Sequence, residues 1–326
     1  MTLPDAVRQL WFLLTHARTY DIVQFHSLSW GTLVSPPLLH LLGKKAIFNS
    51  TLYGSDNPSA VWQARRGHLA GRLLSHFDAI LAISPMLAED YRACGFKNVA
   101  CIPHFMALPQ LQQGCDEAAR GKLRQELSIP SDATVLLFVG SVIKRKGVDL
   151  LAESFARLSA RHHDLWLVVV GPNSRAENLN YDEELGRAVR GTIDGAWAAS
   201  RAIWTGTVSD KDVLARYYSV ADIFVFPTRS EGLGNVLIEA VTAGLPVVAT
   251  NLPGCTDYVV ADGESGYLFP PENVDALTQA VERLVADPVL RARMGQAARA
   301  GSKRFGFGDY CRQLKAFYLS VASIRT

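Results

Sequence analysis

The chain has 326 residues, of which 48% are hydrophobic and 20% are charged, and its formal net charge is +2. These values are typical of a globular protein of about two domains, and they argue against a nucleic-acid-binding protein that depends on phosphate contacts. The five cysteines lie far apart and include no C-x-x-C pair, so neither a disulfide framework nor a zinc ribbon is expected and a reducing, cytoplasmic compartment is favoured.

The first part of the chain alternates short apolar runs with segments of helical periodicity. Four of the runs predict β-strands: DIVQF (21–25), KAIFN (45–49), AILAI (79–83) and VACIP (99–103). Before the first of these strands the sequence reads as a helix, without a glycine-rich strand–loop–helix unit. We therefore expect a first sheet of few strands.

The second part of the chain has six further strand candidates with helical segments between them. They are TVLLFVG (134–140), LWLVVVG (165–171), AIW (202–204), DIFVFP (222–227), PVVAT (246–250) and YLF (267–269). Nearly continuous apolar strands that alternate with helices indicate parallel sheets covered by helices on both faces. The polar segment 109–132 contains no predicted strand. We expect an α/β protein with two Rossmann-like domains, residues 1–125 and 126–305, and a final helix over residues 306–326.

In open parallel sheets, ligands bind beyond the carboxyl ends of the strands, so the loops after strands are the first places to look for function. FVGSVIKRKGVDLL (138–151) contains such a loop, with Lys144, Arg145 and Lys146 between Gly140 and Gly147. Glycines allow the backbone to approach a phosphate, and a lysine supplies positive charge. The loop lacks the Ser or Thr of a Walker motif. The alternative interpretation is a solvated basic loop with a glycine for turning.

The stretch FPTRSEGLGNVLIEAVTAGLPVVAT (226–250) is more specific. Gly232 and Gly234 break regular structure, so Glu231 is expected in a loop, and Asn235 is expected to begin a helix that Gly244 closes. The N–H groups at the start of that helix form an anion site. Carboxylates bind hydroxyl groups well and phosphates poorly.

A nucleotide sugar matches this combination, with Glu231 toward the sugar, the helix start toward phosphate and Glu239 toward the ribose. The alternative for Glu239 is a capping or salt-bridged role.

Residues 222–269 strongly resemble the family-4 retaining glycosyltransferases of GT-B fold. FVGSVIKRKGVDLL resembles a second signature of that family, and WTGTVSDKDVLARYYSVAD (204–222) resembles the segment whose backbone near Val208 faces the nucleotide base. GDYCRQLKAFYLSV (308–321) resembles the helix that crosses back onto the first domain. Relatives of this fold begin with a glycine-rich unit, so the resemblance implies a first domain shortened by roughly 60 residues.

The resemblance carries over to named residues. Lys146 and Glu231 become catalytic candidates, and the donor-binding candidates are Gly140, Ser141, Arg145, Val208, Gly232, Leu233, Gly234, Asn235, Val236 and Glu239. Ser141 stands where the family usually has an arginine, and Arg145 is the candidate that replaces its charge. Tyr53, beside Gly54, stands where the family usually has a histidine before a glycine, and both are acceptor-side candidates. IPHFMA (102–107) replaces the usual asparagine–glycine turn.

The reaction that the resemblance implies is transfer of a hexose from a nucleoside diphosphate sugar, with retention of configuration. Lys146 and the start of the helix at Asn235 would stabilise the charge on the departing diphosphate, so we expect no metal and no cofactor. The resemblance also implies a glycan or lipid-linked acceptor. Two rivals stay open. A sugar-nucleotide epimerase would need histidine near the donor, whereas no histidine follows His163. A non-catalytic nucleotide-sugar-binding subunit is compatible with Ser141 and Tyr53.

Two other sequence features have alternative interpretations. Asp210 and Asp212 have the D-x-D spacing of some metal sites, but they precede a helical pattern, and helix capping is the favoured interpretation. Residues 62–77 combine Arg65, Arg66 and Arg72 with apolar side chains. This segment is either a helix on the surface of a domain, which is favoured, or a helix in peripheral contact with an anionic membrane. The apolar run LWFLL (10–14) is too short to span a membrane.

Overall fold

A computed structural model describes residues 3–63, 67–105, 108–113, 117–179, 181–196 and 198–324. The chain forms two compact units. The first contains residues 1–104, 231–233 and 307–326, and the second contains residues 105–230 and 234–306. The main segment of the first unit thus ends at His104 and not at the predicted residue 125. The helix that covers residue 125 packs against another helix of the second unit.

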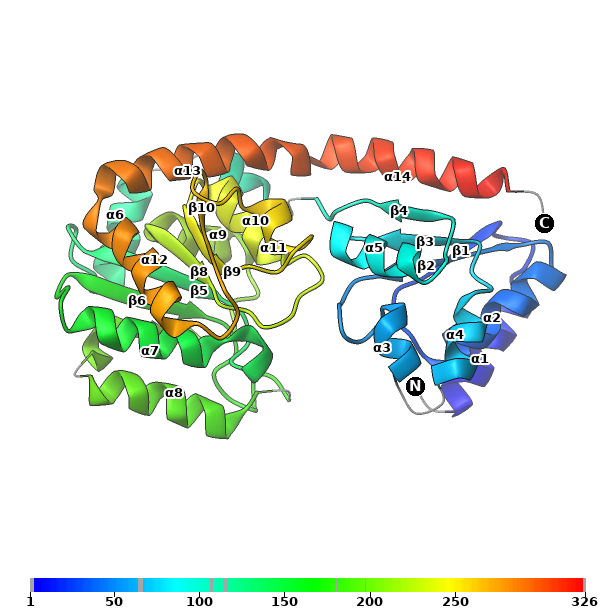
Figure 1. Cartoon of the computed structure of the whole chain (residues 1–326), viewed down its shortest axis with the longest axis horizontal. Coiled ribbons are helices and arrows are strands. Elements are labelled where there is room, and N and C mark those ends of the chain that lie inside the picture. Colours follow the sequence, from blue (N-terminus) through cyan, green and yellow to red (C-terminus); the bar gives the residue numbers. More distant parts are fainter. Residues whose placement is uncertain are drawn as a thin grey trace. The chain divides into compact units, whose positions relative to one another are not determined.

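The first unit is built on a parallel sheet with the strand order β1-β2-β3-β4. Its strands are β1 (Ile22–Phe25), β2 (Lys45–Ser50), β3 (Ala79–Ala82) and β4 (Val99–Cys101). Its helices are α1 (Leu3–Thr15), α2 (Trp30–Leu41), α3 (Pro58–Gln63), α4 (Gly67–Leu74), α5 (Pro85–Ala93) and α14 (Phe307–Ala322) (Figure 1). All four strands predicted in this part of the chain are present.

Alternate residues of the first sheet face two separate cores. Phe25, Phe48 and Ile80 pack with side chains of α1, α2 and α4. Ile47 and Leu81 pack with side chains of α14. This alternation is the two-residue period of a strand that is buried on both faces, and it explains why the strands read as continuous apolar runs.

The second unit is built on a six-stranded parallel sheet with the order β10-β9-β8-β5-β6-β7. Its strands are β5 (Thr134–Val139), β6 (Leu165–Val170), β7 (Ala202–Trp204), β8 (Ile223–Phe226), β9 (Val247–Thr250) and β10 (Gly266–Phe269). All six strands predicted in this part of the chain are present, so the expected α/β fold with two parallel sheets is confirmed.

Helices cover both faces of the second sheet (Figure 1). The α-helices of this unit are α6 (Glu117–Glu126), α7 (Val148–Ser159), α8 (Glu183–Gly195), α9 (Lys211–Val220), α10 (Asn235–Ala243), α11 (Thr256–Val259), α12 (Val274–Ala286) and α13 (Pro288–Ser302). The 3-10 helices are η1 (Pro109–Gln113), η2 (Lys144–Lys146), η3 (Ala199–Arg201) and η4 (Lys303–Phe305). Leu136 and Phe138 of β5 face the core that α7, α8 and α12 cover.

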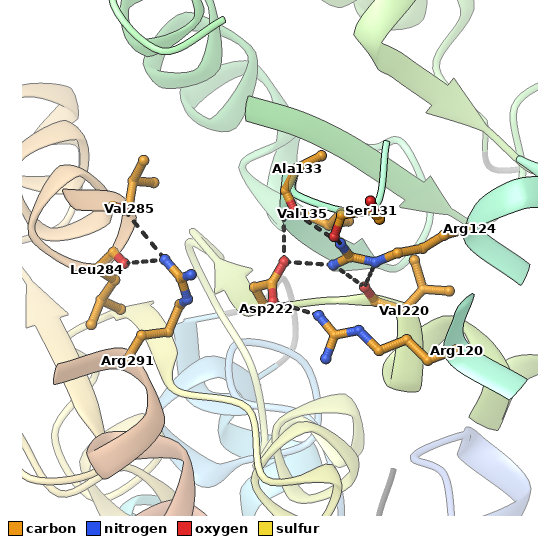
Figure 2. A network of polar contacts seen from close by, with 10 residues as sticks. All are labelled: Arg120, Arg124, Ser131, Ala133, Val135, Val220, Asp222, Leu284, Val285 and Arg291. Carbon is orange, nitrogen blue, oxygen red and sulfur yellow. Dashed lines mark hydrogen bonds and ion pairs between the residues drawn. The ribbon is translucent and has the colours of Figure 1, made fainter. Parts of the chain in front are cut away.

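A buried ion-pair network fixes the amino ends of β5 and β8 to α6 (Figure 2). Arg124, which is 5% exposed, donates to Asp222 Oδ2 at 2.8 Å and to the carbonyl of Val220. Arg120 donates to Asp222 Oδ1 at 2.6 Å, and the backbone N–H of Val135 donates to Oδ2 at 2.8 Å. These groups satisfy one another, as buried charges must. The network therefore explains the packing of α6 and leaves the opposite ends of the strands for ligands.

The basic segment 62–77 covers the end of α3 and all of α4, and its Arg65 and Arg66 lie outside the described residues. Positions 106 and 107 of IPHFMA (102–107) also lie outside them. Trp62 and Leu69 are 43% and 53% exposed. Within the part of the chain that the structure describes, every helix is too short or too polar to cross a membrane.

Candidate functional site

The second sheet has a switch point between β5 and β8. From β5 the chain proceeds to β6 and β7 on one side, and then crosses to β8 on the other side of β5. Loops at such a point diverge above the sheet and leave a crevice at the carboxyl ends of the strands, where doubly wound folds bind their ligands. The two motifs singled out from the sequence follow these two neighbouring strands.

The loop after β5 forms a tight basic turn. Residues Lys144–Lys146 form η2, and Gly147 ends it with φ 68° in the left-handed region. A Cβ atom at Gly147 would lie 1.8 Å from the carbonyl oxygen of Pro227. Glycine is required here both by the backbone conformation and by this close approach. The turn is therefore packed directly against the end of β8.

The ring of Phe226, the last residue of β8, contacts both motifs. The Lys146 Nζ lies 5.4 Å from the centre of this buried ring, in a cation–π contact. A Cβ atom at Gly234, immediately before α10, would lie 3.2 Å from the same ring. The ammonium group of Lys146 and the start of α10 thus both lie beside the Phe226 ring. Such a pairing of positive charge and helix start suits a phosphate.

The helix α10 begins at Asn235 and ends before Gly244, as predicted. Gly234 occupies the N-cap position with φ 80° and, having no side chain, supplies no capping oxygen to the first N–H groups. Val236 is half-buried in the first turn. At the start of the β5 loop, Gly140 donates its N–H to Val170 at 2.9 Å, and Ser141 is half-buried.

Glu239 has a partner, Tyr218, that no local sequence pattern indicates. Tyr218 Oη donates to Glu239 Oε2 at 2.7 Å, and Tyr218 is fully buried. Burial raises the pKa of the Glu239 carboxyl, while the bond from Tyr218 and the charge of Lys211 act to lower it. Burial and the neighbouring carboxylate hold the pKa of Tyr218 well above its ordinary value. Tyr218 therefore stays protonated and fixes one oxygen of the carboxylate.

The loop that carries Val208 is held by Glu177. Glu177 Oε2 accepts hydrogen bonds from the backbone N–H of Thr207 at 2.8 Å, from the hydroxyl of Thr207 at 3.1 Å and from the N–H of Asn173 at 3.3 Å. The hydrogen bond from the Thr207 backbone is the main reason why the pKa of Glu177 lies below its ordinary value. Val208, next in the chain, is half-buried and directly follows the residue that Glu177 holds.

Asp210 caps α9, and the capping interpretation is confirmed. Its Oδ1 accepts the N–H groups of Asp212 and Val213 at 2.8 and 3.2 Å. Asp212 in turn accepts a hydrogen bond from Gln110 at 2.5 Å. Among the described residues, no three or more His, Cys, Asp or Glu side chains are grouped in a way that could hold a metal ion.

Arg145 bonds to the protein backbone. Its Nη1 donates to the carbonyl of Ser230 at 2.7 Å, so this guanidinium joins the loop after β5 to the loop after β8. Arg229, which sequence reasoning missed, reinforces the same junction through Asp149. Arg229 and Asp149 are 80 positions apart in the sequence, so no local pattern indicates their pairing.

Glu231, Gly232 and Leu233 are all buried, and Glu231 is 6% exposed. They belong to the first unit. The acceptor-side candidates of that unit, Tyr53 and Gly54, lie just after β2. Tyr53 is 38% exposed.

The backbone around Tyr53 and Gly54 is held by two polar side chains. Gly54 donates its N–H to Asn57 Oδ1 at 2.7 Å. The buried Asp56 carboxylate accepts the N–H groups of Thr51 and Leu52 at 2.8 and 3.0 Å. The loop after β2 is thus fixed by its own hydrogen bonds.

Known proteins resemble the chain in both sequence and structure. The family model for glycosyl transferases group 1 matches residues 119–301. An alpha-D-kanosaminyltransferase from Streptomyces kanamyceticus is 31% identical over 218 residues, 67% of this chain and 53% of that protein. A D-inositol 3-phosphate glycosyltransferase from Streptomyces bingchenggensis is 32% identical over 307 residues, 88% of this chain and 64% of that protein.

Among solved structures, HepE of Anabaena in complex with UDP superposes with a TM-score of 0.80 at 18% identity, covering 95% of this chain and 82% of that one. At this identity the likeness establishes the fold. The chain spans about half the length of the kanosaminyltransferase. The family model covers more than half of the chain, including both loops at the switch point. The chain belongs to the glycosyl transferases group 1 family.

Proposed function

We propose that this chain is a retaining hexosyltransferase that uses a nucleoside diphosphate sugar and requires neither metal nor cofactor. The observation that carries the proposal is the convergence of Lys146 and the start of α10 on Phe226, at the switch point between β5 and β8. The family membership of residues 119–301 supports the same reaction class.

The positive groups at the switch point suit the hardest part of such a reaction. When the bond between the sugar and the diphosphate breaks, negative charge grows on the departing phosphate. The Lys146 ammonium and the N–H groups at the start of α10 would stabilise that charge without a metal ion. Their positions are fixed by Gly147 and Gly234 before the donor binds, so little reorganisation is needed during the reaction.

The two carboxylates recognise hydroxyl groups in this proposal. Glu231 binds the sugar, and Glu239, held by Tyr218, binds the ribose. The backbone near Val208 faces the base, as in the resembling family. The acceptor attacks from the face that the diphosphate leaves, and a donor phosphate oxygen takes its proton, which preserves the configuration at the anomeric carbon.

For the acceptor we propose a glycan or a lipid-linked sugar, bound near the loop of Tyr53 and Gly54. A lipid-linked acceptor would bring the chain into peripheral contact with a membrane. We propose that this contact is with the cytoplasmic face, where the nucleotide-sugar donors are found. A D-inositol 3-phosphate glycosyltransferase is among the relatives, and a hydroxylated small acceptor is therefore included in the test.

The test is a transfer assay with a panel of UDP- and GDP-hexoses and the three acceptor classes, in which NMR of the product reports its anomeric configuration. The proposal predicts a glycoside with the configuration of the donor, lost in Lys146→Ala and Glu231→Ala. Lys122→Ala, an exposed lysine on α6, should behave as wild type. An epimerised donor, an inverted product or full activity of Lys146→Ala would contradict it.

A further inference from the structure

Arg229 joins three segments of the second unit through two paired sets of hydrogen bonds. Its Nη1 and Nη2 donate to Asp149 Oδ1 and Oδ2 at 2.8 and 3.0 Å. Its Nε and Nη2 donate to Glu272 Oε1 and Oε2 at 2.6 and 2.9 Å. Asp149 lies in the first turn of α7 and Glu272 lies just before α12. A guanidinium held by two carboxylates in this bidentate manner has a fixed orientation.

The same arginine also holds the basic turn η2. Its Nη1 donates to the carbonyl of Lys144 at 2.6 Å, and its backbone N–H donates to the carbonyl of Arg145 at 2.8 Å. Thr228 Oγ1 donates to the carbonyl of Arg145 at 3.1 Å, and the Arg145 guanidinium donates to the carbonyl of Ser230. Successive residues of the loop after β8 therefore hold the turn, mainly by hydrogen bonds to its backbone carbonyls.

The charges around Arg229 are balanced in a way that permits this arrangement. Lys144 Nζ also reaches Asp149 Oδ2, at 2.5 Å. Although burial alone would raise it, the pKa of Asp149 lies below its ordinary value because Arg229 and Lys144 donate hydrogen bonds to the carboxylate. Asp149 thus offsets the repulsion that Arg229 would otherwise exert on the lysines of the turn. The Arg229 side chain is only 19% exposed, so solvent screens these interactions less than those of a surface pair.

We propose that Arg229 is the positioning residue that fixes η2, so that Lys146 meets the terminal phosphate of a nucleoside diphosphate. The inference rests on the proposed function, since it takes Lys146 as the phosphate ligand. Arg229 itself bonds to Asp149, Glu272 and the backbone of the turn. It acts on the donor through the geometry of the turn. Its loss should affect recognition of the second phosphate and leave recognition of the nucleoside and first phosphate nearly unchanged.

The test compares diphosphates with monophosphates. The affinities of UDP, GDP, ADP and TDP and of the matching monophosphates are measured by calorimetry for the wild-type chain, Arg229→Gln, Arg229→Lys, Glu272→Gln and Arg157→Gln. Arg157 is the matched control, because it also bridges two carboxylates, Glu153 and Asp275, but on the exposed surface of α7.

For the diphosphate that the wild-type chain binds, Arg229→Gln should lose about tenfold or more in affinity, while its monophosphate affinity changes by less than about twofold. Arg229→Lys should recover part of the loss, and Arg157→Gln should match the wild type. If Arg229→Gln does not fold, Glu272→Gln carries the test, because it keeps Arg229 and removes half of its support. It should weaken diphosphate binding selectively, by a smaller factor.

Two results separate the inference from the function on which it rests. If the wild-type chain binds a diphosphate and the folded Arg229 and Glu272 variants bind it equally well, or lose diphosphate and monophosphate affinity in parallel, Arg229 has only a structural role and the inference is overturned. If the wild-type chain binds none of the four diphosphates, the proposed function fails at its first step, and the inference fails with it.

Discussion

Tyr218 Oη donates a hydrogen bond of 2.7 Å to Glu239 Oε2. The two residues come from different helices, α9 and α10. One oxygen of the carboxylate is occupied by a tyrosine that is completely buried. The Glu239 carboxylate that is proposed to bind the ribose is therefore already oriented by the protein.

We expect Tyr218→Phe to weaken nucleoside diphosphate binding by roughly tenfold, the order expected for a hydrogen bond to a charged group. Burial raises the pKa of Glu239, and the bond from Tyr218 partly opposes that rise. Without the bond the pKa moves higher, so the carboxylate is protonated at a higher pH. Affinity should fall as the pH decreases in both proteins, and the fall should begin at a higher pH in the variant.

Calorimetric titrations from about pH 5 to about pH 8 check this prediction. Tyr217→Phe removes the same hydroxyl group from the adjacent position and serves as the control. Coincident pH profiles for Tyr218→Phe and Tyr217→Phe would show that Tyr218 does not govern the carboxylate.

We expect Gly147→Ala to destabilise the protein by about 2 kcal/mol or more. The left-handed conformation alone costs an alanine about 1–2 kcal/mol, and the added Cβ would lie 1.8 Å from the Pro227 carbonyl oxygen. Gly191→Ala is the control, because Gly191 lies inside α8 with no atom within 4 Å of an added Cβ. It should gain about 0.5–1 kcal/mol. Urea unfolding measures both, and equal stabilities of the two variants would contradict the role given to Gly147.

We expect Asp149→Asn to lower the free energy of unfolding at neutral pH by about 1–3 kcal/mol. The pKa of Asp149 is lower in the folded protein than its ordinary value of 3.8, so its contribution is present above that value and is lost as the pH falls through the folded pKa. The difference between variant and wild type should therefore shrink in acid.

Unfolding in urea at neutral pH and at about pH 3 tests the dependence. Asp275→Asn removes an exposed carboxylate that pairs with Arg157, and it should cost less than about 1 kcal/mol. A loss in Asp149→Asn that is equal at both pH values would rule out the ionised carboxylate as its cause.

We expect transfer activity to survive EDTA, because the proposed phosphate site consists of Lys146 and the start of α10. Asp210 already accepts two backbone N–H groups at the start of α9, and this role competes with metal binding. Activity is measured with and without the chelator, and then after addition of excess manganese or magnesium. Loss on chelation that either ion restores would instead assign the metal to Asp210 and Asp212.

The strands could be predicted from the sequence because burial leaves a continuous apolar pattern along the chain. The partners of the site residues leave no such local pattern. The inner strands β2, β3, β5, β8 and β9 are buried at every residue, which leaves continuous apolar runs such as TVLLFV in β5. Local signals also predicted the cap at Asp210 and the end of α10 at Gly244. These features depend on residues that are close together in the chain.

The partners of the site residues depend on distant parts of the chain. Arg229 and Asp149 are 80 positions apart, and Tyr218 and Glu239 are 21 positions apart. No periodicity or spacing in the sequence indicates such pairs, because they arise from the order of strands in the sheet. The bond of the Arg145 guanidinium to the carbonyl of Ser230 joins residues 85 positions apart in the same way, and its predicted contact with the donor stays a prediction.

A nucleotide-sugar site at the switch point between β5 and β8 is the central claim. Titration of the wild-type chain and Lys146→Ala with a panel of UDP- and GDP-sugars tests it most directly. The wild-type chain should bind at least one of these donors, and Lys146→Ala should bind the same donor at least about tenfold more weakly while unfolding at the same temperature without ligand. Equal affinities in the two proteins, or no binding to the wild-type chain by any donor, would contradict the account.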